Sequence, residues 1–109
     1  MNVAEVAKQL NLSCHVTGEP DREVKSGYIG DLLSWIMGRA KADSAWVTIM
    51  SNSNVAAVAL LADTSMIILA ENVQPDEGLL SKARQHNIGL YSATEGAYEL
   101  AYKLHALIG

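Results

Sequence analysis

The stretch AWVTIMSNSNVAAVALLADTSMIILA, residues 45–70, decides the fold. Its two ends, residues 45–50 and 66–70, are short apolar runs that predict strands. The second run is uninterrupted, as in a central strand that is covered on both faces. Residues 55–63 between them predict a helix, with the polar residues 51–54 available to cap its first turn. Strand, helix and strand in this order indicate a right-handed crossover and parallel strands.

The same alternation continues to the C-terminus. Residues 76–86 predict a helix with Pro75 in its first turn, a position where the missing N–H costs nothing. We expect Asn87 to close this helix in a left-handed conformation. A short strand follows, and then a last helix. Ser92 and Glu95 have the spacing of a capping box before that helix.

The N-terminal segment is predicted to add a helix and a strand. Four apolar residues at helical spacing predict a helix capped by Asn2, namely Val3, Val6, Ala7 and Leu10. Residues 12–18 alternate between apolar and polar, which is typical of a half-buried strand. In that pattern Leu12, Cys14 and Val16 face one way, so we expect Cys14 to be buried.

Another strand and helix are predicted before residue 45. Residues 23–29 favour a second short strand, and residues 30–42 favour a helix with Asp31 in its first turn, where a carboxylate interacts favourably with the helix dipole. Its core face would be formed by Leu32, Leu33, Ile36 and Ala40. Together, these elements predict an α/β fold. We expect a three-layer α/β/α sandwich with about five strands, mostly parallel, in one domain spanning residues 1–109.

Composition narrows the class of protein. Of the 109 residues, 50% are hydrophobic and 18% are charged, which fits a globular chain. The net charge of −4 and the scattered basic residues argue against nucleic acid or an anionic membrane as the main partner. Cys14 is the only cysteine, which favours the cytoplasm. The three histidines lack metal-ligand spacing, so we expect no metal and no cofactor.

The segment DREVKSGYIGDLLSWIMG, residues 21–38, resembles the DRTGG domain family when it is taken with NVAAVALLA and IILAENVQPDE further along. Asp21 and Arg22 match the first two letters of the family's name, and Gly27 matches the last. Lys25 and Ser26 stand where the family usually has Thr and Gly. The resemblance covers nearly the whole chain, as in a stand-alone member.

The resemblance implies a regulatory role. Domains of this family occur beside CBS domains, in some pyrophosphatases and in phosphate acetyltransferases. The fold is similar to the N-terminal domain of HPr kinase/phosphorylase, whose chemistry resides in a separate domain with a P-loop. This chain has no G-x-x-x-x-G-K-[ST] motif, so the kinase label does not transfer.

A ligand site is predicted from three loops. Arg22 would bind an anion, while Ser26, Gly27 and Asn54 would donate hydrogen bonds and Asp21 would orient the loop. Two further loops follow strands, where ligands of α/β sheets usually bind. They contribute Ser51, Asn52 and Asn54, and Glu71. Structural roles remain open for the same residues: turn capping, helix capping and a surface ion pair of Arg22.

A homodimer is predicted from the helix at residues 55–62, which is apolar on every side. A helix of that kind is expected to be buried all round, with one face on the sheet and another on a second subunit. Aromatic and methionine residues are common interface anchors. The proposed interface residues are Trp35, Met37, Val58, Leu60 and Leu61.

The leading functional hypothesis is a non-catalytic, dimeric regulatory or interaction module. It would sense a small anionic metabolite or a nucleotide, or contact a protein partner. One alternative is an enzyme or accessory protein in phosphoryl transfer or iron-hydrogenase metabolism, which rests on the resemblance alone. The other is a purely structural dimerisation domain.

Overall fold

The computed structural model describes residues 1–109, which form five strands and five helices. The strands are β1 (Ser13–Val16), β2 (Ser26–Ile29), β3 (Ser44–Thr48), β4 (Met66–Leu69) and β5 (Gly89–Ser92). The helices are α1 (Val3–Gln9), α2 (Leu33–Arg39), α3 (Asn54–Ala62), α4 (Glu77–Gln85) and α5 (Ala97–Ile108).

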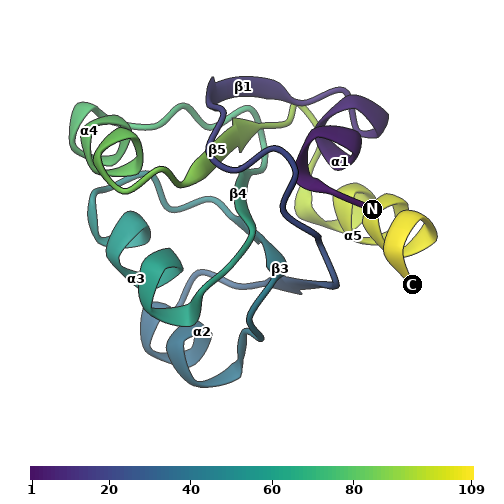
Figure 1. Cartoon of the computed structure of the whole chain (residues 1–109), viewed down its shortest axis with the longest axis horizontal. Coiled ribbons are helices and arrows are strands. Elements are labelled where there is room, and N and C mark those ends of the chain that lie inside the picture. The colour runs from purple at the N-terminus through teal and green to yellow at the C-terminus, as the bar shows by residue number, and fades with distance from the viewer.

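The strands form one sheet in the order β1-β5-β4-β3-β2. The strands β2, β3, β4 and β5 are parallel to one another, and β1 pairs antiparallel with β5. Figure 1 shows α2, α3 and α4 on one face of the sheet and α1 and α5 on the other. The expected fold, an α/β sandwich of three layers with a mostly parallel sheet of five strands, is therefore confirmed.

Two apolar cores lie on either side of the sheet because the central strands alternate their side chains. Ala45 and Val47 of β3 point toward α1 and α5, whereas Trp46 points toward α2, α3 and α4. Every residue of β4 is buried, as the uninterrupted run at residues 66–70 predicts. Both faces of this strand are thus covered, which places it at the centre of the fold.

The N-terminal strand differs from its sequence pattern. Cys14 is exposed rather than buried, and Leu12 and Val16 pack into opposite cores. The pairing of β1 with β5 shifts register between Cys14 and Val16, so a strict alternation of two residues does not hold across it. The N-cap of α1 is confirmed, because the Asn2 side chain accepts a hydrogen bond from the Glu5 N–H at 2.9 Å.

The helix at residues 30–42 is shorter than predicted and begins at Leu33. Asp31 lies before it, where its carboxylate accepts hydrogen bonds from the Thr48 hydroxyl at 2.7 Å and the Ile49 N–H at 3.0 Å. Leu32 is exposed, while Ile36 is fully buried. Asp31 therefore joins the start of α2 to the end of β3 instead of capping the helix.

The other predicted helix ends also require correction. Pro75 precedes the N-cap of α4, which is Asp76, and so lies outside the first turn. The predicted capping box does not form, because Gly96 is the N-cap of α5 and the Ser92 hydroxyl donates to the Val73 carbonyl. Asn87 has the expected left-handed backbone, with φ of 55°.

Helix α3 is only half covered within the chain, contrary to the expectation that it is buried all round. Val55, Val58 and Ala59 lie in the core, but Leu60 and Leu61 are 50% and 74% exposed. The sheet, α2 and α4 cover one side of this helix, and its far side is open. None of the helices combines the length and the apolar character that crossing a membrane would need.

Candidate functional site

Arg22 lies at the centre of a network of charged side chains. Its guanidinium donates to the Asp43 carboxylate at 2.9 and 3.0 Å. It also donates to the carboxylate of Asp63 at 2.9 Å and to the carbonyl of the same residue at 2.8 Å. Glu19 lies 3.5 Å away and Lys25 reaches Asp43 at 3.5 Å. We call these five residues the Arg22 cluster.

The Arg22 cluster is structural rather than a free anion site. Three carboxylates face two cations, so the cluster carries a net negative charge. The hydrogen bond from Arg22 holds the pKa of the Asp43 carboxyl below its usual range. A ligand anion would have to displace these carboxylates from Arg22. The geometry thus favours the ion-pair reading of Arg22, which joins three loops at the amino end of the sheet.

Replacing Arg22 with Ala is expected to cost stability. The Arg22 side chain is 18% exposed, and its bonds to Asp43, which is 30% exposed, are better shielded from water than those to Asp63, which is 67% exposed. We expect Arg22→Ala to lower the free energy of unfolding by about 2 kcal/mol. Urea unfolding followed by circular dichroism measures this. The control is Lys8→Ala, an exposed change on α1 that should have no measurable effect. A wild-type midpoint for Arg22→Ala would contradict the structural role.

The three predicted ligand loops do not converge. Ser26 and Gly27 begin β2, so Asp21 and Arg22 lie at the amino end of the parallel strands. The loops at residues 51–54 and 71–74 follow β3 and β4 and lie at the carboxyl end. A five-residue strand separates the two ends by roughly 15 Å, at about 3.3 Å per residue. The predicted single cleft is therefore wrong, because the first loop precedes a strand.

The two loops at the carboxyl end do lie on the same side, as expected. The Ser51 carbonyl accepts a hydrogen bond from the N–H of Asp76, which follows the second loop. The side chains of Asn52, Asn72 and Gln74 form hydrogen bonds within these loops. The Asn52 side chain accepts at 2.9 Å from the N–H of Asn54, the first residue of α3, whereas the N-cap, Ser53, makes no side-chain capping bond.

Glu71 also has a structural setting. Its carboxylate packs against Gly96, where an added Cβ would lie 2.9 Å from Oε1. That position is the N-cap of α5, and a negative charge is favourable there because of the helix dipole. Glu71 and Asn72 both have a left-handed backbone, with φ of 61° and 56°. Asp31 adds further negative charge at this end, which disfavours an anion, whereas the charge of Glu95 is offset by its salt bridge with Lys103.

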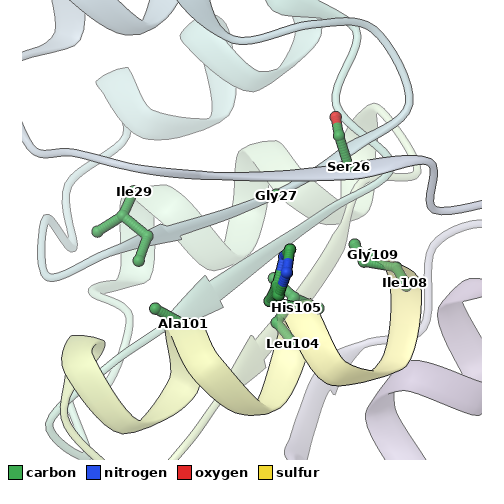
Figure 2. Close-up of a pocket in the computed structure, with 8 residues that line it drawn as sticks. All are labelled: Ser26, Gly27, Ile29, Ala101, Leu104, His105, Ile108 and Gly109. Carbon is green, nitrogen blue, oxygen red and sulfur yellow. The ribbon is translucent and has the colours of Figure 1, made fainter.

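Ser26 and Gly27 line a different hollow, between β2 and α5. It has a volume of about 260 Å³ and is bounded on the helix side by Ala101, Leu104 and His105. Figure 2 shows Leu104 and His105 projecting from α5 toward β2 beside Gly27. An added Cβ on Gly27 would lie 2.8 Å from Leu104, so this glycine permits the close packing of strand and helix.

A second groove runs between α3 and α4 and contains residues that the sequence analysis missed. Its volume is about 290 Å³, and its floor is apolar, formed by Ala56, Ala57, Leu60 and Leu61. Ser53, Asn54, Lys82 and His86 line its polar sides. Lys82 is exposed and forms no ion pair within the chain. The spacing of Lys82 and His86 at i and i+4 was the signal that could have indicated a shared helix face.

His15 and Ser92 lie close together without forming a nucleophilic pair. The Ser92 hydroxyl is 2.8 Å from His15 Nε2, and it donates its hydrogen to the Val73 carbonyl at 2.7 Å. It therefore accepts from the histidine, whereas a nucleophilic serine must donate to it. Burial lowers the pKa of His15, which keeps the ring neutral. No three His, Cys, Asp or Glu side chains are close enough to hold a metal ion.

The proposed interface residues divide between exposed and buried positions. Trp35 and Met37 on α2 are 54% and 49% exposed, and Arg39 stacks over the Trp35 ring at 4.1 Å. Val58 lies in the core and cannot contact a second subunit. Leu60 and Leu61 line the α3–α4 groove.

Comparison with known proteins gives the fold and no more. No family model and no curated protein matches the chain. The solved structures include a match with a TM-score of 0.74, the crystal structure of the CBS and DRTGG domains of the regulatory region of Clostridium perfringens pyrophosphatase, complexed with its activator diadenosine tetraphosphate. The chain has a DRTGG-like fold.

The extent of this match limits what it shows. It covers 94% of this chain and 45% of the pyrophosphatase chain, with 9% sequence identity. The chain thus spans less than half the length of the protein it matches. At this identity the DRTGG-like fold is established, but ligand-contacting residues do not transfer.

Proposed function

We propose that this chain is a non-catalytic regulatory module that binds a nucleotide or another small anionic metabolite in the α3–α4 groove. The observation that carries this proposal is the apolar groove floor beside Lys82 and His86. A flat base can lie on alanine and leucine side chains, while an unpaired ammonium group attracts phosphate. The groove volume, about 290 Å³, is near the lower end of the range for small-molecule sites.

The regulatory role has support from the fold. The matched pyrophosphatase segment is a regulatory region that was crystallised with a nucleotide activator. In our proposal the anion is attracted by Lys82 rather than by Arg22, whose donors are committed to carboxylates. The free thiol of Cys14 fits a reducing compartment, so we place the module in the cytoplasm as part of the proposal.

Ligand binding is tested with two probes, ATP and diadenosine tetraphosphate. At a hundred times its dissociation constant, a bound probe should stabilise the fold by about 2.7 kcal/mol, which raises the melting temperature measurably. Lys82→Ala should weaken binding about tenfold by calorimetric titration, which corresponds to about 1.4 kcal/mol. Lys8→Ala on α1 is the control and should bind as the wild type does.

Two outcomes would reject the groove as the site. One is a melting temperature that neither probe changes at millimolar concentration. The other is binding that survives Lys82→Ala and His86→Ala but is lost in Arg22→Ala when that variant is still folded. The second outcome would return the site to the amino end of the sheet.

We also propose that the module is a homodimer. Trp35 and Met37 of α2 remain candidate contacts because both are exposed. Leu60 and Leu61 are assigned to the ligand groove instead. A purely structural dimerisation domain is the second candidate function, and the open edge at β2 is the observation that favours it.

A further inference from the structure

The α3–α4 groove adjoins a smaller hollow at the ends of the same two helices. The hollow has a volume of about 80 Å³, and it shares Leu60 and His86 with the groove as lining residues. Asp63, the C-cap of α3, and His86, the C-cap of α4, both line it. The hollow therefore lies where the groove reaches the C-terminal ends of α3 and α4.

The groove and the hollow differ in charge. Lys82 is the only Lys, Arg, Asp or Glu residue that lines the groove, whereas Glu19, Arg22 and Asp63 line the hollow. The guanidinium of Arg22 is held by carboxylates, and the Arg22 cluster as a whole is negative. Two helix C-termini add the negative ends of their dipoles. A bound molecule thus meets a cation in the groove and an excess of hydrogen-bond acceptors in the hollow.

Two carboxylates of the hollow retain oxygens without a partner. Asp63 accepts from Arg22 through Oδ1 alone, so its Oδ2 has no hydrogen bond within the chain. Glu19 likewise contacts Arg22 only through Oε1. Thr64 also lines the hollow, and its buried hydroxyl has no hydrogen-bond partner. A donor group of a ligand is therefore favourable here, whereas a phosphate would be repelled.

The dimensions fit one amino group in the hollow and the rest of a nucleotide in the groove. The groove has a volume of about 290 Å³, against about 80 Å³ for the hollow. A base that lies on Leu60 has its edge beside the hollow, because Leu60 lines both. Lys82 precedes His86 by one helical turn, about 6 Å along α4, and helical side chains lean toward the helix N-terminus. A phosphate at Lys82 thus lies on the side away from Asp63.

We propose that the ligand of the α3–α4 groove is a nucleotide whose base carries an exocyclic amino group, and that the Asp63 carboxylate accepts a hydrogen bond from this group. The phosphates lie at Lys82 and the base lies on Leu60, so Asp63 determines which bases are accepted. This inference rests on the proposed nucleotide site and deepens it, because it assigns a residue that distinguishes one base from another.

The test compares ATP with purine riboside triphosphate, which has the same phosphates and the same ring system but no amino group. In calorimetric titration, we expect purine riboside triphosphate to bind about fivefold more weakly than ATP, the loss of one hydrogen bond to a partly exposed carboxylate. Asp63→Gly removes the carboxylate, and glycine tolerates the left-handed backbone at this position, where φ is 58°. The two nucleotides should bind equally to this variant.

The ratio of the two dissociation constants is the quantity to measure. Asp63→Gly also removes a negative charge and a partner of Arg22, but these changes affect both triphosphates alike and cancel in the ratio. Asn11→Gly is the matched control, because it replaces another left-handed residue, with φ of 53°, at the exposed end of α1. It should keep the fivefold preference. Circular dichroism confirms that each variant is folded, and Asp63→Asn, which should narrow the preference, replaces Asp63→Gly if that variant does not fold.

The outcomes separate this inference from the proposed function. Equal binding of both nucleotides by the wild type, with both weakened by Lys82→Ala, would overturn the role of Asp63 and leave the groove as the nucleotide site. A preference for ATP that persists in folded Asp63→Gly would overturn it as well. Binding of neither nucleotide at millimolar concentration would reject the groove and this inference together. A preference that is lost in Asp63→Gly and kept in Asn11→Gly supports the inference.

Discussion

Trp46→Ala should lower the free energy of unfolding by about 4 kcal/mol, a large part of the stability of a chain this size. Trp46 is fully buried in the core beneath α2, α3 and α4. Its indole N–H donates to the Gly30 carbonyl at 2.9 Å, just beyond the end of β2. The substitution would leave a cavity in the core and an unpaired carbonyl beside it.

Trp46→Phe separates these two contributions. It retains much of the apolar volume but loses the donor, so we expect a smaller loss of about 1–2 kcal/mol. Urea unfolding by far-ultraviolet circular dichroism is the suitable measurement, because the substitution itself changes tryptophan fluorescence. Equal losses for the two variants would show that the hydrogen bond, rather than the volume of the ring, dominates.

Gly18→Ala should destabilise the fold by about 3 kcal/mol or more. Gly18 has φ of 65°, and an added Cβ would lie 2.2 Å from the Gly89 backbone nitrogen. The neighbouring carbonyl of Thr17 accepts from the Tyr91 hydroxyl at 3.0 Å. Burial, and secondarily the nearby Cys14, raises the pKa of Tyr91 to about 12, so this donor stays protonated. The loop therefore cannot move away from β5 without losing that bond.

Gly38→Ala is the matched control for this prediction. Gly38 lies within α2, and an added Cβ there would have no neighbour within 4 Å. Alanine has a higher helix propensity, so the change should stabilise the fold by about 0.5–1 kcal/mol. The two substitutions therefore have opposite expected signs in thermal or urea unfolding. A Gly18→Ala variant with wild-type stability would contradict the close packing of this loop on β5.

Much of the fold could be predicted from local patterns. The buried run at residues 66–70 indicates a central strand, and the order of elements after residue 45 indicates parallel strands joined by helices. Helix ends were less predictable. Asp31 has the chemistry of a residue in a helix first turn, but it bonds to Thr48 and Ile49 on a neighbouring strand. Long-range partners of this kind are not encoded in the local pattern.

The candidate site was predicted less well than the fold. Arg22 and the loop at residues 51–54 are both polar and both close to strand ends, so the sequence alone made them plausible partners. They lie at opposite ends of the sheet because Arg22 precedes β2, whereas residues 51–54 follow β3, which runs parallel to β2. The α3–α4 groove was missed because Lys82 and His86 come together with Leu60 only when two helices pack side by side.

The sequence by itself determined the α/β class, the parallel pairing of the central strands and the cap at Asn2, because these depend on periodicity and on residues close in the chain. Only the tertiary structure decided that Cys14 is exposed, that Arg22 is held by Asp43 and Asp63, and that β2 is an open edge. These features depend on strand order and on contacts between distant residues. Packing of the whole chain, rather than any local preference, fixes them.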